Sequence, residues 1–326
     1  MKAQILALLR EREDYVSGQE LCQRFGVSRT AVWKAVGQLK KEGYQIEAVQ
    51  NRGYLLREEN GIFGQHELES RMNTRWAGHP VTFYESLGST NQQAKSDAEN
   101  GAAQGALVVA DMQTAGRGRR GRAWSSPAGT NAYFTLILKP SYKPESASMV
   151  TLVMALAVAE GIRSTCGVDA GIKWPNDIVA DGRKVCGMLT EMSVEREYIH
   201  HVVTGVGINV KRQEFAPEIA ATAVSLEELC EKKISRAELI VNVMRAFENY
   251  YDVFERECSL AGLKEQYNSL LVNCGREVRV LDPKGEYQGV SQGINERGEL
   301  LVELAGGSVQ AVYAGEVSVR GIYGYV

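Results

Sequence analysis

Residues 116–122 read GRGRRGR, and this run of four arginines and three glycines limits the fold and the chemistry of the chain most tightly. The glycine spacing matches the G-x-G-x-x-G motif of dinucleotide-binding folds, which requires a strand before the motif and a helix after it. Residues 106–111 read as the strand, but a turn-like stretch at 124–130 and a second β-like run at 133–138 follow. The sequence therefore predicts a flexible loop between two strands, in which glycine supplies backbone freedom.

The arginines of this loop indicate an anionic ligand. Neighbouring like charges repel one another, and guanidinium forks bind carboxylate or phosphate oxygens. A solvated basic loop and a basic patch for nucleic acid are the alternatives, and the loop alone does not decide among the three.

Composition indicates a soluble globular protein. With 326 residues, of which 44% are apolar and 24% charged, we expect two or three domains. The longest apolar stretch, residues 149–159, is too short to span a bilayer and predicts a buried core helix. No basic and apolar leader opens the sequence, so we expect a cytoplasmic protein with no membrane partner.

The cysteines and histidines argue against a metal centre built from them. The six cysteines are scattered without a C-x-x-C pair, which predicts reduced thiols and no structural zinc site or disulfide scaffold. With only four histidines, a histidine-rich centre is not expected either.

The N-terminal segment has its own charge pattern and periodicity. Residues 24–57 hold seven basic and two acidic side chains, although the whole chain has a net charge of −3, which suggests a separate module with its own partner. Amphipathic helices are predicted at 2–12, at 18–25 and from 29 to Gly43, and a hairpin is predicted to turn around 51–53. A winged helix-turn-helix has this order, with its third helix in the DNA major groove and its wing on the backbone.

The third helix presents one apolar and one polar face. The apolar stripe faces inward, and the side chains off it, together with the hairpin, are the candidates for DNA contact. These candidates are Ser28, Arg29, Thr30, Trp33, Lys34 and Arg52. A small helical protein-interaction domain is the alternative.

Two further polar groups stand where elements are predicted to begin or end. A helix opens at residues 88–92, GSTNQ, whose hydroxyl and amide groups either form a capping box or bind a small polar ligand. In IKWPNDI at 172–178, the proline places Asn176 and Asp177 at a strand end. Lys184 in a predicted hairpin and Asn209 after Gly-Val-Gly have structural explanations singly, but they are placed to converge with these residues on one cleft.

The C-terminal part of the sequence reads as helices followed by strands. Helices are predicted at 216–230 and at 235–258, the latter opening with a capping box. Residues 276–320 alternate short β runs with turns, as in a small all-β domain.

Together these motifs resemble those of biotin protein ligases. They stand in the family's order as STNQ at 89–92, GRGRRGR at 116–122 with Trp124, KWPND at 173–177, RKVCG at 183–187 and GVGIN at 205–209. The N-terminal module makes the chain similar to the bifunctional class, which also represses the biotin operon.

The resemblance implies an α+β multidomain fold. Its parts are a winged helix-turn-helix DNA-binding domain at 1–62, a central mixed α/β ligase domain of the class II synthetase-like type at 63–272, and a C-terminal SH3-like β barrel at 273–326.

The resemblance also implies two half-reactions. The biotin carboxylate attacks the α-phosphate of ATP to give biotinyl-5′-adenylate and pyrophosphate, and a lysine of a biotin carboxyl carrier domain then attacks this mixed anhydride. Arginines on a closing loop would offset the repulsion between the two anions and shield the intermediate from water. By motif position, the catalytic residues are Lys184, Arg119 and Asp177.

Ligand contacts follow from the same motif positions. Biotin contacts are implied for Ser89, Thr90, Asn91, Gln113, Gly116, Arg117, Gly118, Arg119 and Lys184, and contacts with ATP or the adenylate for Arg122, Trp124, Asn176 and Asn209. Asp177 would orient or deprotonate the incoming lysine or touch Mg²⁺. We expect Mg²⁺ as a partner of ATP, and its ligands in the chain are unknown.

The implied partners are the carrier domains of carboxylases, operator DNA and a second copy of the chain. The adenylate is expected to favour a homodimer that binds a two-fold operator. A lipoate-type ligase is one alternative, against which the Gly-Arg run favours biotin. A non-catalytic biotin-sensing transcription factor is the other, and it would not need the arginine loop, Lys184 and Asp177 as a set.

Overall fold

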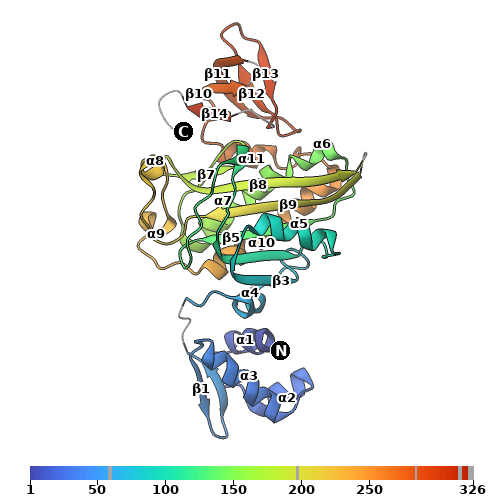
Figure 1. The fold of residues 1–326 in the computed structure, drawn as a ribbon, viewed down its shortest axis with the longest axis vertical. Coiled ribbons are helices and arrows are strands. Elements are labelled where there is room, and N and C mark those ends of the chain that lie inside the picture. Colours follow the sequence, from blue (N-terminus) through green and yellow to red (C-terminus); the bar gives the residue numbers. More distant parts are fainter. Residues whose placement is uncertain (58–60, 196–197, 283–284, 315–317, 322–326) are drawn as a thin grey trace. The chain divides into compact units, whose positions relative to one another are not determined.

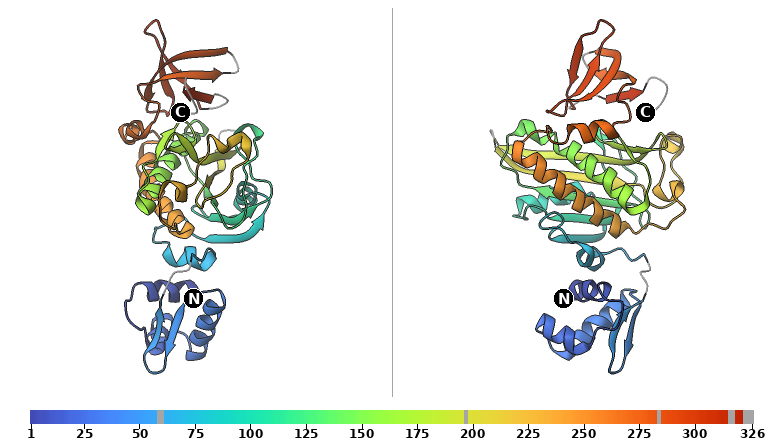
Figure 2. Two further views of the ribbon diagram at one scale, coloured as in Figure 1. Left: turned by 90° about the vertical axis from the view of Figure 1, so that its left-hand side faces the viewer. Right: turned by 180° about the vertical axis from the view of Figure 1, so that it is seen from behind.

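The computed structural model describes residues 1–57, 61–195, 198–282, 285–314 and 318–321. The chain divides into two compact units, shown as ribbons in Figures 1 and 2. Unit 1 comprises Met1–Asn73 with Ser235–Val241, and unit 2 comprises Thr74–Ile234 with Asn242–Val326.

Unit 1 is a small helical module with a two-stranded hairpin. Its elements are α1 (Lys2–Arg10), α2 (Gly18–Phe25), α3 (Arg29–Lys41), β1 (Ile46–Val49), β2 (Gly53–Leu56) and α4 (Gln65–Arg71). The apolar faces of the three helices and the hairpin meet in one core that includes Ile5, Leu21, Val36 and Ile46. The predicted order of three helices and a hairpin is confirmed.

Local signals in the sequence set these element boundaries. The hydroxyls of Ser17 and Ser28 accept hydrogen bonds from the first turns of α2 and α3, and Gly26 ends α2 in the left-handed conformation. The hairpin requires glycine at position 53, because a Cβ there would lie 2.0 Å from the carbonyl oxygen of Val16.

Helix α4 is an addition that the sequence did not predict. The Glu67 side chain is 4% exposed and lies 2.6 Å from guanidinium nitrogens of both Arg10 and Arg71. Because a buried carboxylate is stabilised only when it is paired, the bond to Arg10 attaches α4 to α1, while Arg71 pairs with Glu67 within α4.

Unit 2 is built on a seven-stranded mixed sheet with the order β3-β4-β5-β9-β8-β7-β6. Only β3 and β4 are parallel neighbours. The strands are β3 (Val81–Leu87), β4 (Leu107–Gln113), β5 (Ala132–Leu138), β6 (Gly171–Lys173), β7 (Asp177–Ala180), β8 (Arg183–Glu195) and β9 (Tyr198–Ile208). Helix α5 (Thr90–Glu99) covers one face, and α7 (Val150–Cys166) and α10 (Arg236–Glu257) cover the other (Figures 1 and 2).

Helix α7 is the core helix of unit 2, as predicted from residues 149–159. Together with the short α6 (Pro144–Ala147), it forms a helical run from Pro144 to Cys166. This run is long and apolar enough to cross a membrane, but 72% of its most apolar 18-residue stretch is buried inside the protein. Its side chains therefore serve the interior of the domain.

The helix predicted at 216–230 is wrong as a single element. It is divided into α8 (Pro217–Ala220) and α9 (Leu226–Leu229). Between them the backbone is extended and pairs with the start of β8, since Lys184 donates its N–H to the Thr222 oxygen and accepts from the Val224 N–H. This non-local pairing overrides the helical pattern of the sequence.

The C-terminal part forms a five-stranded antiparallel sheet with the order β13-β12-β11-β10-β14. After α11 (Lys264–Leu270) come β10 (Glu277–Asp282), β11 (Gly285–Ile294), β12 (Leu300–Glu303), β13 (Val309–Val312) and β14 (Ser318–Gly321). The indole N–H of buried Trp174 donates to the Gly298 oxygen at 3.0 Å, which joins this sheet to the turn between β6 and β7.

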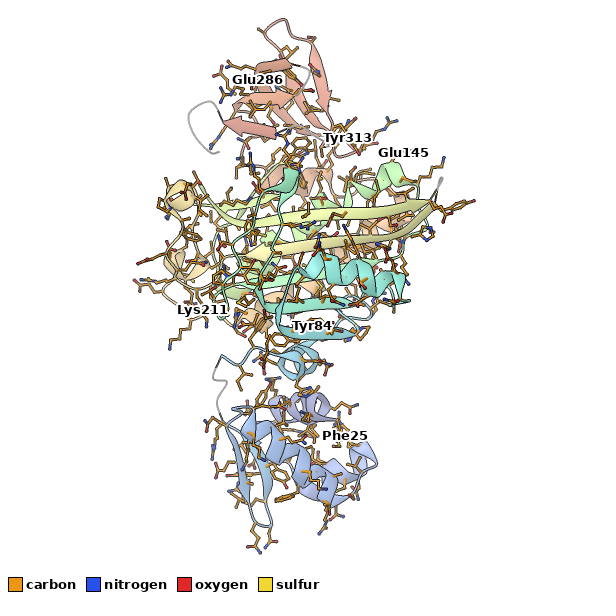
Figure 3. All side chains as sticks on the ribbon, in the orientation of Figure 1. Phe25, Tyr84, Glu145, Lys211, Glu286 and Tyr313 are labelled. Carbon is orange, nitrogen blue, oxygen red and sulfur yellow. The ribbon has the colours of Figure 1, made fainter. Side chains whose placement is uncertain are left out.

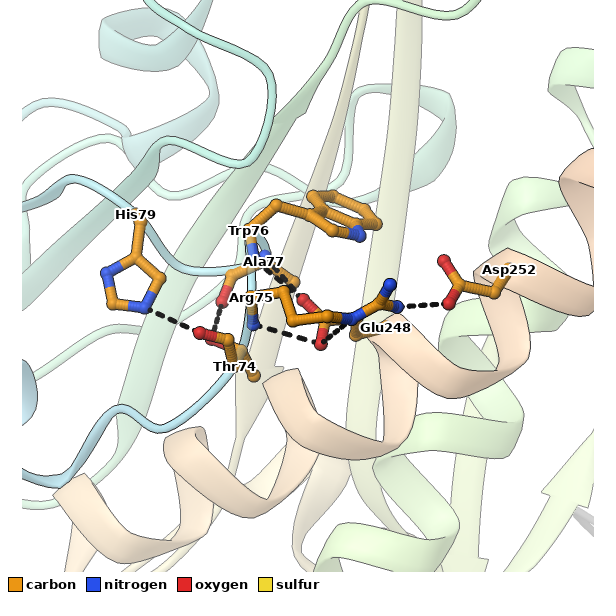
Figure 4. A network of polar contacts seen from close by, with 7 residues as sticks. All are labelled: Thr74, Arg75, Trp76, Ala77, His79, Glu248 and Asp252. Carbon is orange, nitrogen blue, oxygen red and sulfur yellow. Dashed lines mark hydrogen bonds and ion pairs between the residues drawn. The ribbon is translucent and has the colours of Figure 1, made fainter.

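A buried carboxylate fixes the segment that enters β3. Glu248 of α10 accepts hydrogen bonds from the backbone N–H groups of Arg75, Trp76 and Ala77, and the Arg75 guanidinium also contacts Asp252 (Figure 4). Burial alone would raise the pKa of Glu248, but the three backbone donors and Arg75 hold it below its ordinary value. The carboxylate is therefore charged at neutral pH and ties the entrance of the sheet to α10.

Candidate functional site

A cleft of about 660 Å³ opens in unit 2, beside the middle strands of the seven-stranded sheet. Its walls come from the start of α5, the loop between β4 and β5, the turns around β7 and β8, and the segment 213–223. Of the predicted ligase-site residues, those that line it are Ser89, Thr90, Asn91, Gln113, Arg117, Gly118, Arg119, Arg122, Trp124, Asn176, Asp177, Lys184 and Asn209. Gly116 is not among the residues that line the cleft, although its carbonyl oxygen bonds to Trp124.

The loop between β4 and β5 is a closed hairpin. Trp124 donates its N–H to the Gly116 oxygen at 2.9 Å, and Gly118 donates to the Arg122 oxygen at 2.7 Å. A Cβ at Gly116 would lie 2.4 Å from the Trp124 oxygen, so this glycine allows two backbones to approach closely and has no need of conformational freedom. A strand before and a strand after the motif are confirmed, and the short 3-10 turn Arg119–Gly121 is the loop's helical element.

One of the four arginines turns inward. Arg119 donates to the Asn176 side-chain oxygen at 2.9 Å and to the Ala314 carbonyl oxygen at 2.7 Å. Burial lowers the pKa of Arg119, while nearby Asp177 acts in the opposite direction. Ala314 follows Tyr313, whose exposed ring is labelled in Figure 3. Because Ala314 belongs to the C-terminal part of the chain, its bond to Arg119 joins the arginine loop to the C-terminal sheet. The exposed arginines of the loop are Arg117, Arg120 and Arg122.

The cationic end of the cleft is organised around Lys184. Its ammonium lies 2.7 Å from a carboxylate oxygen of Asp177 and 5.3 Å from the centroid of the Trp124 ring. The Trp124 ring rests on Gly187 and Gly207, which face each other on β8 and β9; added Cβ atoms would lie 2.9 and 2.5 Å from ring atoms. Paired charge and an indole over bare backbone suit a ligand that carries both phosphate and an aromatic ring.

The other end of the cleft is polar and uncharged. Thr90 donates from its backbone N–H and its hydroxyl to the Gln113 side-chain oxygen, at 2.9 and 3.0 Å. The Gln113 amide nitrogen donates to the Ser126 hydroxyl at 2.9 Å. Ser89 is the N-cap of α5, but its side chain makes no capping bond. The capping box considered for this helix start is therefore not formed.

One wall of the cleft was missed by reasoning from the sequence. Side chains or backbone of Gln213, Glu214, Phe215, Ala216, Glu218, Ile219, Thr222 and Ala223 line it. They reach the cleft because the chain pairs with β8 at Lys184, and no local pattern in the sequence signals that pairing. Asn131 supports the same wall, since its side-chain oxygen accepts from the Val210 N–H and from the Gln213 amide.

In unit 1 the candidate DNA contacts lie on the exposed side of α3 and in the hairpin. Arg29, Thr30, Trp33 and Lys34 are exposed, and the Trp33 side chain is 68% exposed, which is unusual for tryptophan. The Ser28 hydroxyl instead accepts from the Ala31 N–H at 3.2 Å and caps the helix.

Arg52 lies in the turn of the hairpin. It stacks 4.1 Å above the Tyr15 ring and pairs with Asp14 at 3.2 Å. Its charge is therefore partly balanced within unit 1.

Among the described residues, no group of three or more His, Cys, Asp or Glu side chains converges as a metal site. The six cysteines are free thiols, as predicted.

Three family models match successive parts of the chain. Residues 2–55 match an HTH domain, residues 83–209 match the biotin/lipoate A/B protein ligase family, and residues 274–320 match the biotin protein ligase C-terminal domain.

Individual proteins are similar over nearly the whole length. The bifunctional ligase/repressor BirA of Bacillus subtilis (strain 168) is 36% identical over 306 residues, which cover 93% of this chain and 94% of that protein. The protein of the same name from Escherichia coli (strain K12) is 29% identical over 317 residues, covering 97% and 96%. The solved structure of biotin protein ligase from Aquifex aeolicus in complex with biotin and ATP is similar with a TM-score of 0.66 at 29% identity, covering 74% of this chain and 99% of that one.

Proposed function

Because the chain belongs to the BirA family of bifunctional ligase/repressors, it is a biotin–protein ligase and a DNA-binding repressor, and we propose how its cleft performs the ligation. Biotin and ATP react there to give biotinyl-5′-adenylate, and biotin then passes to a lysine of a biotin carboxyl carrier domain of a carboxylase. The observation that carries this proposal is the polarity of the cleft, with neutral hydrogen-bonding groups at one end and Lys184 with Trp124 at the other.

The neutral end suits the ring of biotin, which offers amide-like donors and acceptors without charge. Ser89, Thr90 and Gln113 supply hydroxyl and amide groups there, and Asn91 forms the floor. Gly116, Arg117, Gly118 and Arg119 then cover the carboxylate end of biotin. The dense bonding of Thr90 to Gln113 supports this assignment, because pre-positioned partners reduce the entropy lost on binding.

The cationic end suits the adenylation step. A biotin carboxylate oxygen attacks the α-phosphorus of ATP, and the bond to the leaving pyrophosphate breaks. Lys184 and Arg119 supply fixed positive charge where the two anions meet, so their repulsion is offset in the transition state. Arg122, Trp124, Asn176 and Asn209 hold the adenylate, with the Trp124 ring against adenine.

The second step forms an amide. The ammonium of the carrier lysine first loses a proton to Asp177, the neutral amine attacks the acyl carbon, AMP leaves with the electrons of the broken acyl–oxygen bond, and the new amide nitrogen loses a second proton to solvent. Asp177 orients the incoming ammonium once Lys184 has turned to the phosphate, which the 2.7 Å contact between the two side chains supports. Mg²⁺ enters with the phosphates of ATP.

The finer features of the fold are part of the same proposal. Domains are assigned to 1–62, 63–272 and 273–326, the central one as a class II synthetase-like domain and the last as an SH3-like barrel. The five-stranded antiparallel order of β10 to β14 supports the barrel. The bond from Arg119 to the Ala314 oxygen gives this domain a part in the site.

As a repressor, the protein would place α3 in the major groove and the hairpin on the backbone. Arg29, Thr30, Trp33 and Lys34 contact DNA from α3, with Ser28 at its start and Arg52 from the hairpin. Adenylate accumulates when carrier domains are scarce, and it favours a homodimer that matches a two-fold operator in the cytoplasm.

One assay tests the ligase. Purified protein is incubated with biotin, Mg²⁺, α-labelled ATP and a carrier domain, and pyrophosphate release, AMP formation and biotin on the carrier are measured. Turnover with biotin is expected. Preference for lipoate would identify a lipoate-type ligase, and binding of biotin without turnover would identify a ligand-sensing transcription factor; either result overturns the proposal.

A further inference from the structure

Asn91, at the start of α5, has both N–H donors of its side-chain amide bonded to the protein. The amide nitrogen donates to the Leu189 carbonyl oxygen at 3.1 Å and to a Glu191 carboxylate oxygen at 2.8 Å. The amide oxygen accepts from the Thr135 hydroxyl at 2.8 Å. An asparagine side chain has two N–H donors, so neither is left for a ligand.

The partners determine which way this amide points. The Leu189 carbonyl and the ionised Glu191 carboxylate can only accept hydrogen bonds, so the nitrogen must face them. Thr135 must then donate to the oxygen. Asn91 is 6% exposed and Thr135 is fully buried, so a rotated amide would leave buried groups without partners, at a substantial cost in free energy.

The amide lies across three adjacent strands. Thr135 on β5, Gly205 on β9 and Leu189 on β8 are register partners and form one row across the sheet. Asn91 bonds to the outer two and rests on the middle one, where a Cβ on Gly205 would lie 2.0 Å from the Asn91 oxygen. This contact sets the depth to which the start of α5, with Ser89 and Thr90, enters the cleft.

Glu191 holds α5 at two points one turn apart. One carboxylate oxygen accepts from Asn91, and the other pairs with the ammonium of Lys95, four residues further along the helix. Glu191 lies two residues after Leu189 on β8, so both side chains point to the same face of the sheet. Glu191 does not itself belong to the lining of the cleft.

We propose that Glu191 is a positioning residue of the biotin site, which acts through Asn91 to fix the start of α5 and so sets the affinity for biotin. The inference rests on the proposed function, because it assigns biotin to the end of the cleft that Ser89 and Thr90 line. Glu191 touches neither substrate, so its removal should weaken biotin binding and leave ATP binding and the chemical step nearly intact.

The test compares two substitutions of equal length in biotin-dependent exchange of labelled pyrophosphate into ATP. Glu191→Met removes the acceptor, and about a tenfold rise in the biotin KM is expected, as for loss of one hydrogen bond to a charged group. Glu191→Gln retains an oxygen that can accept from Asn91 and should stay close to wild type. In both variants kcat and the ATP KM should remain within about twofold of wild type, since the groups at the other end of the cleft are unchanged.

Two further variants test whether Glu191 acts on the biotin site through Asn91 or through Lys95. Lys95→Ala removes the ion pair but leaves the bond to Asn91, so the biotin KM should hardly change. Asn91→Ala combined with Glu191→Met should be no worse than Asn91→Ala alone, because both act through one amide. Should Glu191→Met not fold, Glu191→Asp withdraws the carboxylate by one methylene and should raise the biotin KM instead.

Several results would overturn the inference. One is an unchanged biotin KM in folded Glu191→Met, or in Glu191→Asp if Glu191→Met does not fold. Another is an equal rise of the biotin KM in Glu191→Gln and Glu191→Met. A fall in kcat alone, or additive effects on the biotin KM in the double variant, would also overturn it. Wild-type protein without biotin-dependent exchange would instead refute the proposed function, so the two failures are distinguishable.

Discussion

Replacing Lys184 by glutamine tests the proposed centre of the chemistry. The substitution keeps the approximate length of the side chain and removes a charge that lies 2.7 Å from Asp177 and is 24% exposed. A cation about 4 Å from charge developing on the α-phosphate contributes about 4 kcal/mol at an effective dielectric constant of about 20. That energy corresponds to roughly a thousandfold in rate, and with the partial exposure of Lys184 we expect a loss of kcat between about 10² and 10³, the range for one preorganised donor.

The measurement is biotin-dependent exchange of labelled pyrophosphate into ATP, which follows adenylation without the carrier. Lys184→Arg keeps the charge on a differently shaped head group and should recover part of the lost rate. The fold should persist in Lys184→Gln, because Arg119 still lies near Asp177 and balances its charge. Thermal melting provides this control.

A folded Lys184→Gln protein that exchanges pyrophosphate within tenfold of wild type would refute the reasoning. Equal loss in Lys184→Arg and Lys184→Gln would also refute it, since the effect would then come from shape rather than charge. A collapse of the melting temperature would show that Lys184 serves the fold.

Three other predictions address the loop, the buried carboxylate and the DNA module. In Arg119→Lys, the lysine cannot bind the Asn176 side chain and the Ala314 oxygen together as the guanidinium fork does, so kcat/KM should fall about tenfold. The control Arg120→Lys, at an exposed position, should match wild type. Equal kcat/KM values in the two variants would reject the role of the bridge. Glu248→Gln should lower the free energy of unfolding at pH 7 by about 1–3 kcal/mol. Because the pKa of Glu248 is lowered in the folded state, its stabilisation is complete above the unfolded pKa of about 4.3 and is lost as the pH falls through the folded pKa. The difference in melting temperature between wild type and Glu248→Gln should therefore shrink at pH 3. A difference that does not change with pH would contradict this. Arg29→Ala with Lys34→Ala should weaken operator binding and reduce the slope of log Kd against log salt by about two if both contact phosphates, and an unchanged slope would count against α3.

The sequence predicted best where the structure depends on neighbours in the chain. Unit 1 could be read because helix caps and apolar stripes act within a few residues: Ser17 and Ser28 cap α2 and α3, and Gly26 ends α2. The strands around the arginine loop could be read for the same reason.

The rest depends on contacts between distant segments. Glu191 reads as an ordinary partly exposed strand residue until Asn91, 100 positions earlier, is seen to donate to it. Residues 216–223 of the cleft wall read as part of a helix until their pairing with β8 is known. Each motif therefore indicated that a site exists, while the geometry within the site came from pairings without a local signal.

The floor of the cleft provides a last test, because two glycines on one strand support its two ends separately. A Cβ at Gly205 would lie 2.0 Å from the Asn91 oxygen, and a Cβ at Gly207 would lie 2.5 Å from the Trp124 ring nitrogen. Gly205→Ala must therefore displace the start of α5 and should raise the biotin KM, whereas Gly207→Ala must displace the indole and should raise the ATP KM. A tenfold effect on one substrate corresponds to about 1.4 kcal/mol of lost binding. The two variants carry the same added methyl group two residues apart, so each is the control for the other, and a general disturbance of β9 would raise both constants together. Crossed effects in pyrophosphate exchange, with Gly205→Ala raising the ATP KM and Gly207→Ala the biotin KM, would show that biotin and the adenylate do not occupy the two ends as assigned.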